Sequence, residues 1–137
     1  MAIFGDRSLK NLSGIHPDLV KVMKEAIKNT PIDFTITEGV RTVQRQQELY
    51  AQGRTKPGPI VTNADGIRNK SNHQIKNDGY GHAVDLYPYI DGKVDISAIK
   101  ELRIIAAHIK KTASDLGIKI VWGGDFKSIP DAPHFEI

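Results

Sequence analysis

Apolar residues recur with helical spacing in three segments of the chain. After Pro17 they return every three or four positions, which predicts an amphipathic helix that begins at this proline. A glutamine-rich segment starts after Thr42, a typical capping residue, and meets Gly53, a natural stop, so it predicts a second helix. Ser97 is expected to cap a third helix, which ends at Gly117. The expected buried face of this third helix consists of Ile99, Leu102, Ala106, Ile109, Ala113 and Leu116.

Short segments of strand character separate the helices. Residues 34–37 alternate apolar and threonine side chains, and residues 82–90 form a longer strand-like run. An Asp-Gly pair follows that run and predicts a hairpin with residues 93–96 as the return strand. Residues 118–122 are typical of a further strand. Because helices and short strands mix and the clear strand pair is antiparallel, the pattern predicts an α+β fold, with a small antiparallel sheet and about three helices.

Residues 54–81 form a long segment that is rich in Gly, Pro, Asn and Lys. Loops of this length in a compact domain usually carry function or move. The chain has no internal repeat and no linker, and its composition is that of an ordinary globular protein, with 39% hydrophobic and 26% charged residues. We therefore expect residues 1–137 to form a single domain.

The charge balance is mildly basic, with a formal net charge of +3. Such a charge favours approach to an anionic partner, whether nucleic acid, lipid headgroups or an anionic cell wall. The basic residues are scattered and lack aromatic neighbours, so we expect no nucleic-acid binding. No apolar run approaches the roughly 20 residues of a membrane span, so we expect no stable membrane insertion. We also expect the chain to be a monomer. The N-terminal segment lacks the apolar core of a signal peptide, which predicts synthesis in the cytoplasm without one.

The chain has no cysteine, so a metal site must use His, Asp or Glu side chains. One such set is His73 on the long segment, Asp85 on the expected strand and His134 near the C-terminus. Two imidazoles and one carboxylate leave the fourth position of a tetrahedral Zn²⁺ open, as in catalytic zinc sites. His82 lies three residues before Asp85, and strand side chains alternate between faces, so these two should point to opposite sides. His82 is therefore expected behind the metal ligands or at the surface.

Three other polar residues have separate expectations. His16 precedes Pro17 and is expected at the start of the first helix. His108 lies off the apolar face of the third helix and is expected in solvent. Asp125, beside two glycines, is either a turn residue or a carboxylate that orients a zinc-binding histidine.

Four ordered motifs carry a resemblance to a known family. They are G-V-R-T at residues 39–42, S-x-H ending at His73, G-x-A-x-D ending at Asp85 and D-x-x-H ending at His134. Together they resemble the small zinc peptidases that cut peptidoglycan stem peptides. That group includes D-alanyl-D-alanine dipeptidases and carboxypeptidases, L-alanyl-D-glutamate endopeptidases and phage endolysins, and Sonic hedgehog shares its fold. The resemblance covers about residues 34–137.

The resemblance implies a role for several residues besides the three zinc ligands. Asp131 would be the general base, and the Ala-Pro pair after it predicts a turn that points it into the cleft. Arg41 would bind the substrate carbonyl or the developing oxyanion. Ser71 would bind substrate backbone, or else cap the loop. Trp122 resembles an aromatic cleft wall, with core packing as its alternative.

The implied function is that of a zinc-dependent peptidoglycan hydrolase of the endolysin type, which cleaves the L-alanyl-D-glutamate bond of the stem peptide after other proteins open the membrane. The alternatives are a D-alanyl-D-alanine dipeptidase or carboxypeptidase, and a non-catalytic binding module that zinc stabilises.

In one respect the chain departs from the family pattern. The segment between His73 and Asp85 is five residues longer than in the usual family pattern. These residues should lengthen the loop after His73, at a small cost in conformational entropy.

Overall fold

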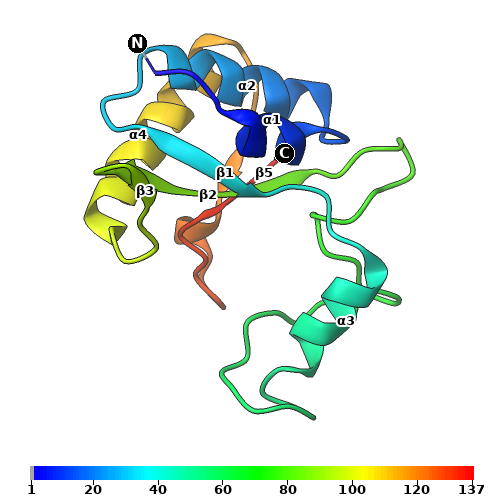
Figure 1. Ribbon diagram of the computed structural model, residues 1–137. Helices are drawn as coiled ribbons and strands as arrows, with labels where there is room; N and C mark the ends of the chain where they lie inside the picture. Colours follow the sequence, from blue (N-terminus) through cyan, green and yellow to red (C-terminus); the bar gives the residue numbers. More distant parts are fainter. Residues whose placement is uncertain (1) are drawn as a thin grey trace.

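Five short strands form one antiparallel sheet in the computed structural model, which describes residues 2–137 (Figure 1). The strand order is β1-β2-β5-β4, and β3 pairs with β2 outside this path. The strands are β1 (Phe34–Glu38), β2 (Ala83–Ile90), β3 (Lys93–Val94), β4 (Val121–Trp122) and β5 (His134–Glu136). Because β5, the last strand of the chain, pairs with the central strand β2, the C-terminal segment lies in the middle of the fold.

Within residues 2–137, four α-helices and one turn of 3-10 helix accompany the sheet. They are α1 (Asp6–Leu12), α2 (Pro17–Lys28), α3 (Val43–Ala51), α4 (Ile99–Asp115) and η1 (Gly123–Asp125). Helices α1, α2 and α4 gather on one side of the sheet, whereas α3 and the segment after it extend away from them (Figure 1). This arrangement confirms the expected α+β class. No helix within residues 2–137 has both the length and the apolar character that a membrane crossing requires.

One face of the sheet packs on the helices, and the other face is polar. Val84 and Leu86 of β2 are fully buried in the hydrophobic cluster, and so is Phe135 of β5. Side chains alternate along a strand, so Asp85 and His134 project from the opposite face. Because the apolar residues of β2 and β5 are buried against the helices, Asp85 and His134 must point away from them.

The helix boundaries agree with the sequence pattern at most points. Pro17 is the first residue of α2, and His16 caps this helix by accepting a hydrogen bond from the Asp18 backbone N–H at 3.1 Å, as expected. Thr42 caps α3 by accepting from the Arg45 N–H at 3.1 Å. Gly117 follows α4 with a positive φ of 72°, a conformation that favours glycine.

Three expectations for α4 were wrong. Ser97 does not cap the helix, because its N–H and hydroxyl both donate to Asp95 Oδ1 and Ala98 takes the N-cap position. Ile99 is 39% exposed, so it lies outside the buried face. His108 is only partly exposed; its Nε2 donates to the Ala26 carbonyl at 2.9 Å and ties α4 to α2. Buried carbonyls need donors, and the acceptor carbonyl belongs to α2, so the pattern of α4 alone could not indicate this bond.

The five extra residues after His73 form a compact hairpin. Ile75 and Gly81 make an antiparallel bridge, and the Lys76 N–H donates to the Tyr80 carbonyl at 2.9 Å. At the base, the His82 N–H donates to the Asn72 carbonyl at 2.7 Å. The expected longer loop is therefore closed by its own backbone bonds.

Candidate metal centre

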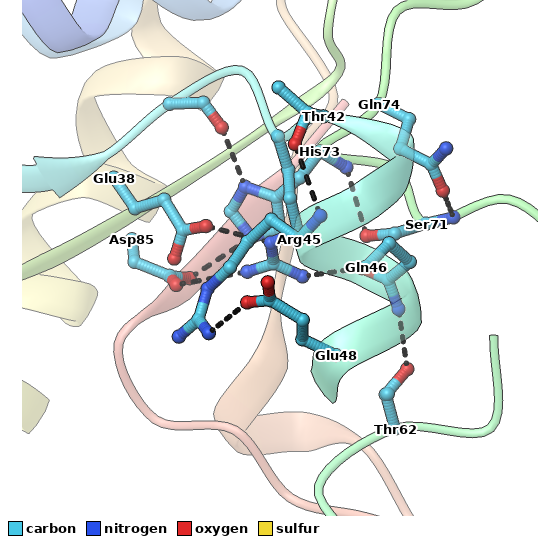
Figure 2. Close-up of polar contacts among 12 residues, drawn as sticks. Glu38, Thr42, Arg45, Gln46, Glu48, Thr62, Ser71, His73, Gln74 and Asp85 are labelled. Atoms are coloured by element: carbon cyan, nitrogen blue, oxygen red, sulfur yellow. Dashed lines mark hydrogen bonds and ion pairs between the residues drawn. The ribbon is translucent and has the colours of Figure 1, made fainter. Parts of the chain in front are cut away.

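The side chains of His73, Asp85 and His134 converge on the polar face of the sheet (Figure 2 shows the first two). Each offers one ligand atom, and these atoms all lie within 4.8 Å of one another. Asp85 Oδ1 is 3.2 Å from His73 Nε2 and 3.5 Å from His134 Nδ1, and the two ring nitrogens are 3.1 Å apart. The three residues proposed from the sequence thus form a single group that could hold a metal ion.

Sheet register brings two of these residues together. Asp85 on β2 pairs directly with His134 on β5, so their side chains are neighbours on the same face. His73 comes from the loop, where its carbonyl accepts from the Arg41 N–H at 2.8 Å and its Nδ1 bonds the Gly39 carbonyl at 3.0 Å. Gly39 itself has no room for a side chain, because a β-carbon there would collide with the Asn11 carbonyl.

Hydrogen bonds set the proton positions on both histidines. A carbonyl only accepts, so His73 Nδ1 must be the donor to Gly39, and Nε2 faces the centre with its lone pair. His134 Nε2 lies 2.7 Å from Glu136 Oε1 and donates to it in the same way, which leaves Nδ1 facing the centre. Asp85 Oδ1 is buried and has no hydrogen-bond partner in the described part of the chain. Three converging lone-pair atoms, one of them an orphaned carboxylate oxygen, fit a bound cation.

The same clustering shifts the pKa values of the group. Burial alone would lower the pKa of His134, but its contacts with Asp85 and Glu136 outweigh burial and raise the pKa to about 9. Burial alone would raise the pKa of Asp85, whereas its contacts with His134 and His73 hold it well below the usual range. Both shifts have the same physical cause, the close approach of a buried carboxylate to two imidazoles.

Glu136 is a residue of this site that the sequence reasoning missed. One of its oxygens accepts from His134, and the other accepts from the Asn72 side chain at 2.7 Å. Its pKa is lowered, chiefly by the bond to His134, which outweighs burial. A strand predicted at residues 134–136 would have placed Glu136 beside His134, because residues two positions apart in a strand point to the same face. Asp125, the carboxylate considered for this role, is exposed and pairs with Lys110 at 2.6 Å, which agrees with the turn alternative.

Arg41 lies beside the cluster with its side chain only 10% exposed. Its Nε donates to Glu38 Oε1 at 2.7 Å and its Nη1 to Gln46 Oε1 at 2.8 Å, while Nη2 is 3.8 Å from Asp85 Oδ2. Gln46 is fully buried and also donates to Thr62 Oγ1 at 3.2 Å (Figure 2). These contacts fix the guanidinium and leave N–H groups on Nη1 and Nη2 for another acceptor.

Asp131 occupies a turn next to His134, as the sequence predicted. The His134 N–H donates to the Asp131 carbonyl at 3.1 Å, and Asp131 Oδ2 lies 3.9 Å from His134 Nδ1. The carboxyl is 45% exposed, and its pKa is raised by burial and by repulsion from Asp85. Gly123 packs beneath this turn, where a β-carbon would collide with the Asp131 carbonyl and lie 2.8 Å from His134 Cβ.

A cavity of about 270 Å³ opens beside the cluster. Its lining includes Arg41, Ser71, His73, Asp131, His134 and Glu136. The Ser71 hydroxyl accepts from the His73 N–H at 3.1 Å, so it caps the loop while facing the cavity. The cavity also has an aromatic wall, Phe126, whose ring centroid is 5.6 Å from that of His134.

Two residues considered for the site lie elsewhere. Trp122 does not line this cavity; it packs against the hydrophobic core and its indole N–H donates to the Ala132 carbonyl at 2.6 Å. This location corresponds to the core-packing alternative. His82 bonds Asp78 at 2.7 Å and meets the His16 ring edge to face, with centroids 5.0 Å apart, and it is not part of the group of ligand atoms.

Comparisons with known proteins give a consistent result. The family model of the phage L-alanyl-D-glutamate peptidases matches residues 1–137. The L-alanyl-D-glutamate peptidase of Escherichia phage T5 is 33% identical over 134 residues, which cover 98% of this chain and 88% of the phage protein. The peptidoglycan L-alanyl-D-glutamate endopeptidase CwlK of Bacillus subtilis is 38% identical, over 91% of this chain and 74% of that protein. The crystal structure of the L-Ala D-Glu endopeptidase ChiX of Serratia marcescens superposes with a TM-score of 0.73 at 31% identity, covering 98% of this chain and 88% of that one.

Proposed function

Since the chain belongs to the family of phage L-alanyl-D-glutamate peptidases, we propose that it is a zinc-dependent hydrolase that cuts the L-alanyl-D-glutamate bond of peptidoglycan stem peptides. The observation that carries the zinc requirement is the orphaned Asp85 Oδ1, which faces two histidine lone pairs. His73, Asp85 and His134 would hold the ion. When bound, zinc activates a water near neutral pH and polarises the scissile carbonyl.

The residues around the ion would divide the remaining work. Asp131 accepts a proton from the attacking water and returns it to the leaving amine as the C–N bond breaks, so the products are a carboxylate and an amine. Arg41 offers its remaining N–H groups to the carbonyl oxygen, where negative charge develops. Ser71 keeps its hydroxyl proton to donate to substrate backbone. The Gly39 carbonyl and Glu136 keep the two histidines in their ligating tautomers.

The bond that is cut can be identified from product masses. We expect a defined stem peptide to yield L-alanine-terminated and D-glutamate-initiated fragments. Release of terminal D-alanine with an intact L-alanyl bond would instead identify a D-alanyl-D-alanine peptidase, and absence of any cleavage would favour a zinc-stabilised binding module. The relatives named above are L-alanyl-D-glutamate enzymes, which favours the first outcome.

The proposed site of action is the cell wall, reached from the host cytoplasm after the membrane has been opened. The phage family supports this proposal, because phage proteins are made inside the host cell.

We also propose that the chain acts as a single catalytic domain and as a monomer. The hydrophobic core is one buried cluster, and the cavity beside the metal group is lined by residues of one chain. Size-exclusion chromatography with light scattering should give a mass near 15.2 kDa.

Removing the metal should destabilise the protein. A ligand that binds only the folded state stabilises it by about 2.7 kcal/mol at 100 times its Kd, which corresponds to a Tm shift of roughly 5–10 °C for a domain of this size. We therefore expect EDTA to lower the Tm by this amount and zinc to restore it. The matched control is His73→Ala, which should show no response to either. A wild-type Tm that ignores both additions would contradict a three-ligand site.

Glu136 should matter for metal affinity through His134. Loss of an outer-shell partner typically weakens metal binding by about 10–100-fold, so we expect this loss in Glu136→Ala and a smaller one in Glu136→Gln, which keeps an acceptor oxygen. Competition with a chromophoric chelator would measure the zinc Kd. Asp125→Asn removes a carboxylate that pairs with Lys110 instead and should leave the Kd unchanged. Wild-type affinity in Glu136→Ala would mean that the short contact to His134 does not orient this ligand.

A further inference from the structure

One arginine and one lysine line the cavity, and they differ in their partners. Arg41 is held by Glu38 and Gln46 and lies close to Asp85. Lys70 is exposed and makes no hydrogen bond or ion pair among residues 2–137. An exposed cation that lines a cavity without an internal partner is available to an anion from outside.

The backbone that carries Lys70 is fixed. Lys70 and the next three residues, up to His73, all line the cavity. Gln74, only 2% exposed, anchors this stretch by accepting from the Ser71 N–H at 2.9 Å and donating to the Gly66 carbonyl at 3.1 Å. The lysine is therefore attached three residues from a candidate metal ligand and directly before Ser71, whose N–H is bonded to Gln74.

The cavity needs such a cation if its substrate is anionic. Asp131 and Glu136 line it, and Asp85 touches both ligand histidines. A substrate carboxylate entering this region meets like charges, which oppose binding unless a positive group faces it. The zinc charge and Arg41 are directed at the scissile carbonyl in the proposed function, which leaves Lys70 for a second anionic group.

The proposed substrate has such a group. A glutamate whose amino nitrogen forms the scissile bond can continue the peptide through only one of its two carboxyls. The other is a free carboxylate, unless it is amidated. We propose that Lys70 forms a subsite for this free carboxylate, so that the enzyme prefers peptides with a carboxylate, rather than a carboxamide, on the residue after the scissile bond. This inference rests on the proposed function and specifies its substrate class.

Two peptides that differ at one group test the subsite. One carries the free glutamate carboxylate and the other the carboxamide, and kcat/KM is measured on both with wild type, Lys70→Gln and Arg68→Gln. Arg68 is an exposed cation of the same loop that does not line the cavity. A charge-assisted hydrogen bond at an exposed lysine should give wild type a preference of about 10-fold for the carboxylate.

We expect Lys70→Gln to abolish this preference, mainly through a higher KM for the carboxylate peptide, with unchanged kcat/KM on the carboxamide. Arg68→Gln should keep the preference. Equal losses on both peptides, or a preference that persists in Lys70→Gln, would overturn the subsite while the hydrolytic function stands. If wild type cuts neither peptide at the L-alanyl bond, the proposed function fails and the subsite fails with it. The zinc content and Tm of Lys70→Gln should match wild type, which excludes a folding defect.

Discussion

Replacing Asp131 by asparagine should lower kcat by about 10²–10⁴-fold, the usual contribution of a general base. Asparagine has nearly the same shape but cannot accept the proton of the attacking water. The turn should persist, because its hydrogen bonds run through the backbone atoms of Asp131, to the Gly123 carbonyl at 2.8 Å and from the His134 N–H at 3.1 Å. Zinc content and KM should therefore stay close to wild type. Initial rates on a defined stem peptide and metal analysis of the same sample would measure both.

Asp125→Asn is the matched control for this variant, because Asp125 is a nearby carboxylate that pairs with Lys110. It should keep full activity. If Asp131→Asn hydrolysed the peptide at the wild-type rate, another group would have to take the proton. Loss of zinc together with activity in Asp131→Asn would instead indicate that this carboxylate supports the metal group rather than the reaction.

Replacing His73 by alanine should remove both bound zinc and activity. The variant keeps two ligand side chains, and it loses the ring whose Nε2 faces Asp85 Oδ1 at 3.2 Å. We expect a larger loss of zinc affinity than the about 10–100-fold typical of an outer-shell partner, and hydrolysis below detection. His82→Ala is the control from the same stretch, because His82 bonds Asp78 outside the group, and it should keep both properties.

A folding defect in His73→Ala must be separated from loss of the ligand, since this side chain is only 1% exposed. His73→Gln retains a polar group that can bond the Gly39 carbonyl and should fold with a metal-free Tm near that of wild type. Both variants should lack zinc. Full zinc and full activity in His73→Ala would show that the five extra residues had transferred the ligand position to another group.

The sequence predicted the group of candidate metal ligands because each of its members stands at a point where the local pattern is informative. Asp85 lies between apolar residues of a strand, so its face follows from alternation. The turn before His134 follows from Ala-Pro. His73 was harder to place, because the spacing to Asp85 is unusual. The structure explains how it remains in the group: the extra residues pair with one another in a hairpin between Ile75 and Gly81.

The parts that the sequence did not predict depend on tertiary contacts. Strand β5 is three residues long, too short for a periodic signal, so Glu136 and its bond to His134 were missed. Helix α1 was missed for a similar reason, since it has seven residues and buries only Ser8 and Leu12. Gln46 is fully buried, and the sequence of a glutamine-rich helix does not indicate which glutamine is buried. Gln46 is held there by bonds to Arg41 and to a loop later in the sequence.

The most direct test of the proposed zinc peptidase activity is a zinc titration of metal-free protein. The chain is stripped with a chelator, zinc is added in known ratios, and hydrolysis of a defined stem peptide is followed at each ratio. We predict no hydrolysis without metal, a linear return with added zinc, and saturation near one zinc per chain, with every product arising at the L-alanyl-D-glutamate bond. Hydrolysis that survives chelation, or that fails to return with zinc, would contradict the account.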